Sequence, residues 1–244
     1  MKIALIGYGR MGHMIEKIAR ARGHEIVAVV DVDSDTSINS DKFRSADVAI
    51  EFSIPSSAAD NCIAALTEGV KVVSGTTGWA SRLPEAEAAC QANPSTAFMW
   101  SSNYSIGVNL FKRITAYASR LLATQPQYVA RLHEVHHVHK LDHPSGTAIT
   151  LAETVIANTP ALTGWSEDPA CGADTLEITH ERRGEVPGIH EVSWESDADI
   201  ITITHSAKSR EGFALGAVMA AEWLATRTGV HSIDEMIDQL AAIG

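Results

Sequence analysis

The chain has 244 residues, and 19 Lys and Arg residues against 30 Asp and Glu residues give it a formal net charge of −11 with histidine neutral. Nucleic-acid binding requires a basic surface, so this acidic balance argues against it. The sequence has neither a signal peptide nor a run of roughly eighteen apolar residues. Its three widely spaced cysteines fit neither a disulfide framework nor a zinc site. We therefore expect a cytoplasmic protein without membrane contact.

The N-terminal part of the chain alternates short β-rich runs with helical patterns. Strands are predicted at 2–6, 25–30, 48–52, 70–74 and 95–100. Helices are predicted between them at 11–22, 55–68 and 84–92. This regular alternation predicts a mostly parallel sheet with right-handed crossovers. The polar segment 31–45 is predicted to be a loop, and apolar residues spaced by three or four predict a long helix over 105–123.

The pattern changes after this helix. Strands are predicted at 127–137, 174–182, 189–196 and 199–206, with one helix at 146–158 among them. Such a strand-rich block predicts a mixed or antiparallel sheet in a second domain. Helices return at 212–226 and after the capping box at 232–235. The predicted fold class is α/β, with a Rossmann-type parallel sheet domain and a second α+β domain that contains a mixed or antiparallel sheet.

A glycine motif follows the first predicted strand and opens a helix, which is the context that a dinucleotide-binding loop requires. Gly7 permits a tight turn, Gly9 lets the backbone approach a pyrophosphate, and Gly12 allows close packing of helix on strand. Asp31, at the end of the second strand, is placed to accept hydrogen bonds from the adenosine ribose. The motif predicts a dinucleotide site, and a glycine-rich turn without a ligand is the alternative.

Two polar loops follow later strands of the same sheet. Gly75, Thr76, Thr77 and Gly78 stand at its carboxyl edge, where open α/β sheets bind ligands, and these small residues let a flat nicotinamide ring approach the backbone. The loop at 101–104 lies where the two regions of the chain join, so it is a candidate for cofactor contact, for a hinge, or for both. A plain structural loop is the alternative in each case.

Five of the eleven histidines fall between residues 133 and 143. Imidazole binds zinc, but ligands spaced by three or four residues converge only on a helix. Pro144 and the alternating pattern of the residues before it argue against a helix here. We therefore predict no metal site in this segment, and a surface patch of histidines is a further alternative.

Acid–base and anion chemistry is the preferred interpretation of the same segment. Ser145, Gly146 and Thr147 begin a predicted helix, where hydroxyl groups and free backbone N–H groups form a receptor for a carboxylate or phosphate. Lys140 and the neighbouring histidines add positive charge and proton donors. A hydride donor in one domain and an anion pocket in the other predict a reductase. The turn at 182–188 could add charge to that pocket or to the interface with a partner subunit, or be a plain solvated turn. The segment around His205 could act as a hinge, contact the substrate, or be a plain loop.

The segment EVHHVHKLDHPSGTA at 134–148 resembles the signature of bacterial 4-hydroxy-tetrahydrodipicolinate reductase, also called dihydrodipicolinate reductase, of diaminopimelate and lysine biosynthesis. The resemblance continues, in order, through GYGRMG at 7–12, GTTG at 75–78, SSNYSIGVN at 101–109, RRGEVPG at 182–188 and SAKSREGFALGAV at 206–218. It thus covers nearly the whole chain. The long His/Lys signature is specific, whereas the glycine loop is not.

The resemblance implies a Rossmann domain built from residues 1–103 and 210–244, and a substrate-binding and oligomerisation domain at 104–209 that assembles a homotetramer. It implies that NAD(P)H reduces a cyclic dicarboxylate, with His136 and Lys140 as the catalytic proton donors. The implied substrate contacts are His137, Ser145, Gly146 and Thr147. The implied cofactor contacts are Gly7, Tyr8, Gly9, Arg10, Met11, Gly12, Asp31, Gly75, Thr76, Thr77, Ser101, Ser102, Asn103 and Tyr104. The residues support this chemistry, because cationic Lys140 and His136 would stabilise charge that develops as hydride arrives and would then supply the proton.

Some positions depart from the family pattern. The glycine loop is one residue shorter than in many members, and the region at 31–45 is abbreviated. Val32 follows Asp31 where some members carry a basic residue that neutralises a 2′-phosphate, so NADH is favoured over NADPH. Two other functions are kept open: a different two-domain nicotinamide dehydrogenase acting on aspartate-derived metabolites, and a non-enzymatic NAD(P)-sensing protein.

Overall fold

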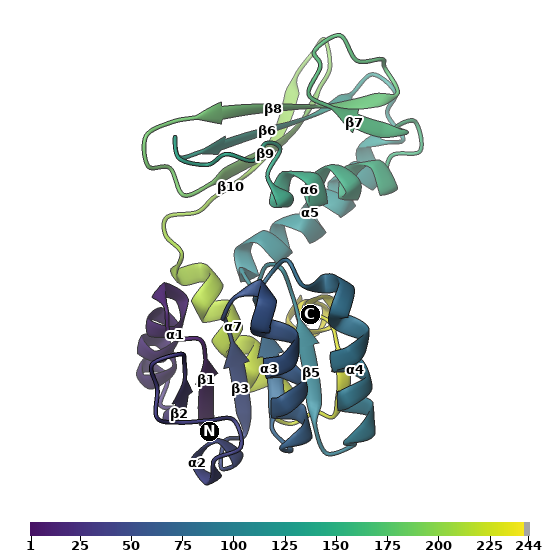
Figure 1. The fold of residues 1–244 in the computed structure, drawn as a ribbon. Helices are drawn as coiled ribbons and strands as arrows, with labels where there is room; N and C mark the ends of the chain where they lie inside the picture. The colour runs from purple at the N-terminus through teal and green to yellow at the C-terminus, as the bar shows by residue number, and fades with distance from the viewer. Residues whose placement is uncertain (242–244) are drawn as a thin grey trace. The chain divides into compact units, whose positions relative to one another are not determined.

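The computed structural model describes residues 1–241, and the chain divides into two units (Figure 1). Unit 1 comprises Met1–Ile106 and Glu211–Gly244, and unit 2 comprises Gly107–Arg210. The sequence placed the first boundary at residue 103 and the second at 209. The roles predicted for these two parts, cofactor binding for one and substrate binding and assembly for the other, stay predictions.

Unit 1 is built on a parallel sheet, as predicted, which contains the five predicted strands and a sixth, β11. Its strand order is β11-β5-β4-β3-β1-β2. The strands are β1 (Lys2–Ile6), β2 (Glu25–Val30), β3 (Val48–Glu51), β4 (Lys71–Ser74), β5 (Ala97–Trp100) and β11 (Gly229–His231). The strands next to β1 are β2 and β3, on either side, so successive chain connections leave β1 in opposite directions. Such a switch point opens a crevice at the carboxyl ends of the strands, where ligands of this fold bind.

Helices cover both faces of this sheet (Figure 1). One apolar layer joins the sheet to α1 (Arg10–Ala21), α7 (Glu211–Leu224) and α8 (Ile233–Ala241), and the other joins it to α2 (Asp41–Arg44), α3 (Pro55–Thr67) and α4 (Leu83–Ala92). Both faces of each central strand are therefore buried, which explains why these strands are apolar runs without alternation. A short 3-10 helix, η1 (Ala80–Arg82), precedes α4.

The prediction of a loop over 31–45 is wrong at its C-terminal end, where α2 forms a single turn. Ser40 caps this helix by accepting a hydrogen bond from the Phe43 backbone N–H, at 3.3 Å. Phe43 is completely buried in the layer on that face of the sheet. One anchored aromatic residue and one cap thus hold a turn that is too short to give a helical pattern in the sequence.

Unit 2 contains a mixed sheet, one of the two kinds predicted for this block, with five strands in the order β10-β9-β6-β8-β7. Its strands are β6 (Val129–His136), β7 (Gly164–Ser166), β8 (Thr175–Arg182), β9 (Ile189–Glu195) and β10 (Ile200–Ser206). Strand β6 pairs antiparallel with β9 and parallel with β8. Helices α5 (Ile106–Leu122) and α6 (Gly146–Ala157) pack on one face around Leu132, Ile178, Val192 and Leu151.

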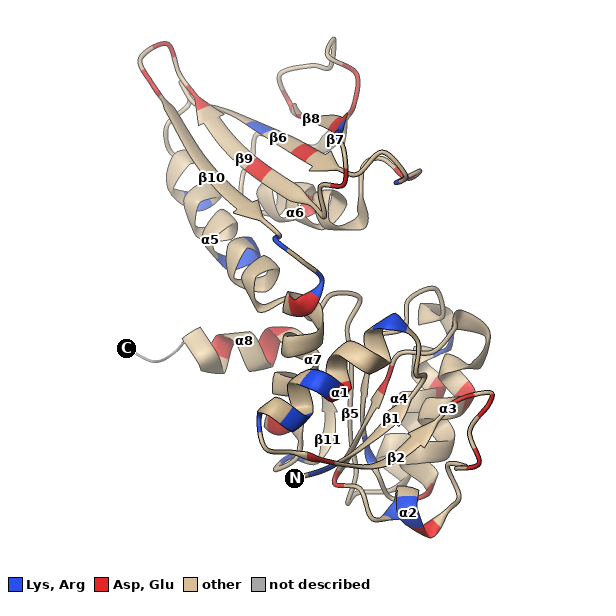
Figure 2. Ribbon diagram, turned by 90° about the vertical axis from the view of Figure 1, so that its left-hand side faces the viewer, with Lys and Arg blue, Asp and Glu red and all other residues tan. Residues whose placement is uncertain are grey.

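Charged residues lie on β6, β8 and β9 (Figure 2), and Arg131, Glu177 and Glu191 among them alternate with buried residues, so their side chains belong to the other face of the sheet. Arg131 is within ion-pair distance of Glu177 and Glu195 on the neighbouring strands. Val129 and Ile200 lie in register with Glu195 and are more than half exposed. Among residues 1–241, no helix combines the length and the hydropathy that crossing a bilayer requires.

Candidate active site

The glycine loop joins β1 to α1 at the switch point of the sheet, and two of its glycines are required by packing. Gly7 has a φ of +86°, and a Cβ there would lie 2.2 Å from the carbonyl oxygen of Phe52. A Cβ on Gly12 would lie 2.5 Å from the carbonyl oxygen of Gly7. By contrast, no atom of the described chain lies within 4 Å of a Cβ placed on Gly9. The space beside Gly9 is therefore open to a ligand.

Gly9 is also the N-cap of α1 and has no side chain to satisfy the first backbone N–H groups of this helix. These N–H groups and the positive end of the helix dipole form an anion receptor. The Asp31 carboxylate follows β2 and accepts hydrogen bonds from the backbone N–H groups of Tyr8 and Val32, both at 2.7 Å. Asp31 is thus fixed against the glycine loop, and its remaining lone pairs are suited to ribose hydroxyls. Arg10 and Met11 begin α1 beside it.

The residues after β3, β4 and β5 meet at the same edge of the sheet and are organised by a buried carboxylate that the sequence reasoning missed. Glu51 is completely buried at the end of β3 and accepts hydrogen bonds from the hydroxyls of Ser53, Ser74 and Thr76, at 2.5–2.7 Å. A charged residue at the end of the buried run Val48–Glu51 was the available signal. Because three hydroxyls and one N–H of Ser53 satisfy this charge, it fixes the loops without itself facing a ligand.

The predicted contacts in these loops differ in accessibility. Thr77 and Ser102 are exposed at the carboxyl edge, whereas Thr76 is buried and its hydroxyl donates to Glu51. A Cβ on Gly75 would overlap the Phe52 ring. The Ser101 hydroxyl accepts a hydrogen bond from the Asn103 backbone N–H at 3.1 Å. Tyr104 lies in the core, and its hydroxyl contacts the carbonyl oxygens of Ser74 and Met99, so only its backbone remains for the cofactor contact predicted from the sequence.

Unit 2 contains a second site organised by a different buried carboxylate, Glu134 on β6. Its oxygens accept hydrogen bonds from the Ser145 backbone N–H at 3.1 and 3.2 Å. They lie 3.4 Å from His136 Nδ1, 3.6 Å from His190 Nε2 and 3.6 Å from the Arg182 guanidinium. Burial acts to raise the pKa of Glu134, but the contacts with His190 and Ser145, together with the nearby His136, outweigh it and lower the pKa to about 2. Glu134 therefore remains ionised and holds His136, His190 and Ser145 together.

His136, a predicted catalytic residue, ends β6 and is 7% exposed. Burial lowers its pKa to about 4, although the nearby Glu134 carboxylate acts in the opposite direction. The imidazole is thus neutral at neutral pH in the substrate-free protein, and the cationic His136 expected as hydride arrives stays a prediction for the substrate complex. Its ring contacts the His190 ring edge to face at 5.1 Å, and its Nε2 faces Gly188, where a Cβ would lie 3.2 Å away.

Lys140 lies in the loop between β6 and α6, and its Nζ donates to both carboxylate oxygens of Asp142 at 2.8 Å. Arg182 holds this loop by donating to the carbonyl oxygens of Lys140 at 3.2 Å and Asp142 at 2.7 Å. Half-buried His137 precedes them, with its ring 6.0 Å from that of His139. The structure thus gives Arg182, which the sequence left open, a positioning role for the loop that carries Lys140.

The N-terminus of α6 adjoins this group of residues. Ser145 is the N-cap, and its hydroxyl accepts a hydrogen bond from the Ala148 N–H and contacts His190 Nε2, both at 3.2 Å. Ser145 is 3% exposed, so its hydroxyl is committed inside the protein. Gly146 is exposed and Thr147 is half-buried. No atom of the described residues lies within 4 Å of a Cβ placed on Gly146, so a ligand can approach the helix end there.

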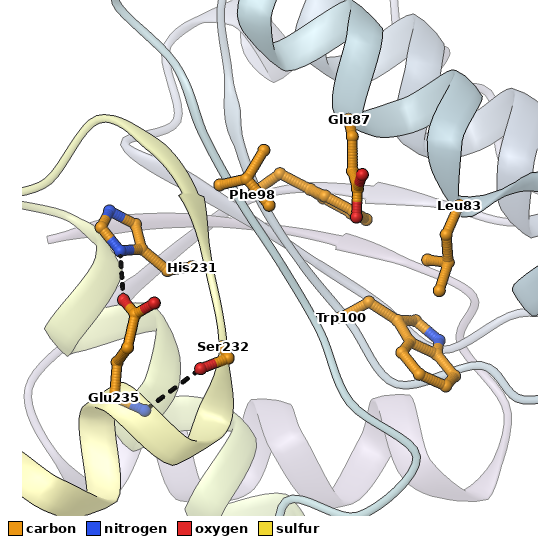
Figure 3. Close-up of a pocket in the computed structure, with 8 residues that line it drawn as sticks. Leu83, Glu87, Phe98, Trp100, His231, Ser232 and Glu235 are labelled. Carbon is orange, nitrogen blue, oxygen red and sulfur yellow. Dashed lines mark hydrogen bonds and ion pairs between the residues drawn. The ribbon is translucent and has the colours of Figure 1, made fainter.

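Unit 1 also contains a pocket away from the glycine loop (Figure 3). It is lined by residues of α4, β5, β11 and the start of α8, including Glu87, Trp100 and His231. Figure 3 shows His231 beside Glu235, and their contact is 2.7 Å long. Strands β5 and β11 form the edge of the sheet opposite to β2. This pocket is therefore distant along the sheet from the glycine loop.

Comparison with known proteins is decisive about the family. The family model described as "Dihydrodipicolinate reductase, N-terminus" matches residues 1–104, and "Dihydrodipicolinate reductase, C-terminus" matches residues 107–237. The chain belongs to the dihydrodipicolinate reductase family. It is 43% identical over 240 residues to a 4-hydroxy-tetrahydrodipicolinate reductase from Christiangramia forsetii, covering 98% of this chain and 99% of the relative. It is 33% identical over 263 residues to one from Archaeoglobus fulgidus, covering 98% of this chain and all of the relative.

Solved structures extend this finding to the fold. A dipicolinate-bound dihydrodipicolinate reductase from Paenisporosarcina sp. TG-14 is similar with a TM-score of 0.76 at 20% identity, covering 95% of this chain and 97% of that one. An amine dehydrogenase from Mycobacterium smegmatis is similar with a TM-score of 0.61 at 11% identity, covering 96% and 95%. Both likenesses support the α/β fold with a Rossmann-type parallel sheet.

Proposed function

We propose that the chain catalyses the reduction of 4-hydroxy-tetrahydrodipicolinate to tetrahydrodipicolinate in diaminopimelate and lysine biosynthesis, with NAD(P)H as the reductant. The observation that carries this proposal is the grouping in unit 2 of Lys140, His136 and the open N-terminus of α6, in a chain whose unit 1 has a dinucleotide-binding loop. The full-length similarity to reductases of this family supports it. A different dehydrogenase that uses Cys62 or Cys90 as its nucleophile is disfavoured, because burial raises the pKa of the Cys62 thiol and Cys90 is also buried.

The residues of unit 1 fit a nicotinamide dinucleotide. The N-terminus of α1 and the open space at Gly9 would hold the pyrophosphate, and the Asp31 carboxylate would accept hydrogen bonds from the ribose. The exposed residues Thr77 and Ser102 would line the nicotinamide end at the carboxyl edge of the sheet. When bound, the reduced nicotinamide supplies the hydride for the reaction.

The residues of unit 2 would bind and protonate the substrate. The N–H groups of Gly146 and Thr147 would hold one carboxylate, and His137 would contact the substrate beside it. Lys140 carries the positive charge that stabilises developing negative charge, and it is a proton donor once the substrate displaces Asp142. His136 is neutral before substrate binds, and a dianionic substrate would raise its pKa and let it take up and deliver a proton.

We propose NADH as the preferred cofactor. The Asp31 carboxylate would repel a 2′-phosphate, and Val32 beside it is 92% exposed and carries no positive charge to bind one. We also propose a homotetramer that assembles in the cytoplasm through the open face of the sheet of unit 2. The apolar residues Val129 and Ile200 on that face, more than half exposed, and the ion pairs of Arg131 with Glu177 and Glu195 support such an interface.

A coupled assay tests these proposals. The substrate is generated in situ by the preceding synthase, and loss of NADH or NADPH absorbance is followed with each cofactor in turn. We expect turnover with both cofactors and a higher kcat/KM with NADH. A His136→Ala, Lys140→Ala double variant should lose at least about 10²-fold in kcat while still binding NADH. Unchanged turnover in this variant would overturn the mechanism, and NADH binding by the wild type without turnover would favour a sensor.

A further inference from the structure

A second group of chemically active side chains lies on unit 2, outside the proposed reaction site. His143 belongs to the loop before α6, Glu167 directly follows β7, and His180 is on β8. His143 Nδ1 lies 3.1 Å from both carboxylate oxygens of Glu167, and His180 Nδ1 lies 2.9 Å from Glu167 Oε1. The two imidazole rings stack at 4.3 Å with an interplanar angle of 20°. Three segments that are distant in sequence thus direct two ring nitrogens at one carboxylate.

This arrangement matches the ligand set of a transition metal. One nitrogen from each histidine and one carboxylate oxygen all lie within 4.8 Å of one another. Two histidines and one carboxylate bind Zn²⁺ in sites that leave a further position open, with metal–ligand bonds of about 2.0–2.2 Å. Ligand atoms bound tetrahedrally to one ion at that length are about 3.3–3.6 Å apart, so the nitrogens, now 2.9 and 3.1 Å from the Glu167 oxygens, need to separate from them by only about 0.5 Å to admit the ion.

A second group has a similar composition, namely Glu134, His136 and His190. Its surroundings are less favourable for a metal ion than those of His143, Glu167 and His180. In that group, the carboxylate already accepts two contacts from the Ser145 N–H, and the Arg182 guanidinium lies 3.6 Å away. A metal ion would have to compete with that fixed positive charge, and all three residues are buried. His143 and His180 are accessible to solvent, so an ion can reach them.

We propose that His143, Glu167 and His180 bind a divalent transition-metal ion of the Zn²⁺ class. Its structural effect follows from the position of His143, two residues before the cap of α6 and three after Lys140. Arg182 already holds the carbonyl oxygens of Lys140 and Asp142 from β8. An ion at His143 would attach the C-terminal end of the same loop to β8 and to the end of β7. The metal would therefore anchor the loop that carries Lys140 without touching the reacting groups.

Metal binding to the untagged full-length protein tests the proposal. After dialysis against a chelator and its removal, Zn²⁺ is titrated by calorimetry, and Co²⁺ is titrated by its visible absorption as a spectroscopic probe of the ligands. We expect one ion per chain in the wild type. His180→Gln and Glu167→Gln should each raise the dissociation constant at least roughly tenfold, since even the loss of an outer partner of a ligand costs that much. Circular dichroism checks that both variants fold.

His231→Gln is the matched control, because His231 and Glu235 form a histidine–glutamate pair and no second histidine among residues 1–241 contacts that carboxylate. This variant should bind the ion as the wild type does. Absence of binding by the wild type, or equal affinity in the wild type and His180→Gln, would overturn the proposal. It would also be overturned if His190→Gln abolished binding while His180→Gln retained it, because the ion would then occupy the buried group around Glu134.

Discussion

We assign one ligand to the start of α1 in unit 1 and another to the start of α6 in unit 2. These two helix ends are alike in exposing a glycine and differ in what holds them in place. Each exposes a glycine, Gly9 or Gly146, beside which the described structure leaves space for a ligand. The start of α1 is shaped by backbone packing at Gly7 and Gly12. The start of α6 is instead held by a cap, Ser145, whose N–H binds a buried carboxylate.

Because of this difference, the two sites should respond to different changes in sequence and in pH. The glycine loop depends on the absence of side chains at Gly7, Gly9 and Gly12 and on its hydrogen bond to the Asp31 carboxylate. The site in unit 2 depends on an ionised Glu134 and a neutral His136, so it should be sensitive to the removal of a charge and to acid. The following predictions test the contrast through free energies of unfolding and kinetic constants, from the largest expected effect to the smallest.

Removing the buried carboxylate should have the largest effect. Glu134→Ala leaves the Arg182 guanidinium and two imidazoles without their shared partner, and breaking a buried ion pair costs about 3–5 kcal/mol. We expect a loss of this size in the free energy of unfolding, measured by urea denaturation. Glu153→Ala, at an exposed position on α6, is the control and should change stability by less than about 0.5 kcal/mol. Equal stability of the two variants would contradict the organising role of Glu134.

In unit 1, adding one methyl group at Gly7 should destabilise the fold by about 2–4 kcal/mol. Gly7→Ala combines a φ of +86° with a Cβ only 2.2 Å from the Phe52 carbonyl oxygen. Gly23→Ala separates these causes, because Gly23 has a φ of +84° but no described atom within 4 Å of its Cβ position. It should cost only about 1–2 kcal/mol in the same urea experiment. If Gly7→Ala cost no more than Gly23→Ala, close packing would not be what requires this glycine.

The same contrast explains how much of the molecule the sequence could predict. The glycine loop was predicted because its determinants are neighbours: a strand, a turn and a helix within Lys2–Ala21. The long strands and helices were predicted because their apolar periodicity is local. Strands β7 and β11 are three residues each and follow no pattern of their own, since pairing with β8 and β5 defines them.

The chemistry of unit 2 was predicted only in part, for a related reason. The histidine-rich segment identifies His136, Lys140 and the helix start, all within twelve residues of chain. The burial that makes His136 neutral, and the contacts of Glu134 with Arg182 and His190, come from strands that are far apart in the sequence. The prediction against a metal site concerned the histidine-rich segment and did not consider Glu167 and His180, which folding brings to His143.

Acid should weaken the protein through His136. Its pKa is about 4 in the folded chain and about 6.5 when unfolded. Between these values the unfolded chain binds a proton that the folded chain does not, so stability is present above pH 6.5 and is lost as the pH falls towards 4. Glu134, with a pKa of about 2, adds a loss below about pH 4.

Urea denaturation at pH 7 and pH 5 measures this effect. The wild type should lose about 1–2 kcal/mol more between these two values than His136→Gln does, because the variant lacks the titrating group. His139→Gln, which removes an exposed histidine, should retain the full loss of the wild type. The same dependence on pH in His136→Gln and the wild type would mean that other groups cause the acid sensitivity.

The smallest effects should come from alanine at the two open glycines, and these variants assign each helix end to its ligand. Gly9→Ala and Gly146→Ala place a methyl group in open space at ordinary φ values, so neither should change stability by more than about 1 kcal/mol. Each methyl group would occupy the space that we assign to an anion. We expect Gly9→Ala to raise the KM for NADH about tenfold, or about 1.4 kcal/mol, with the substrate KM unchanged, and Gly146→Ala to do the reverse. A loss of affinity for the same ligand in both variants would refute the assignment of the dinucleotide to α1 and of the dicarboxylate to α6.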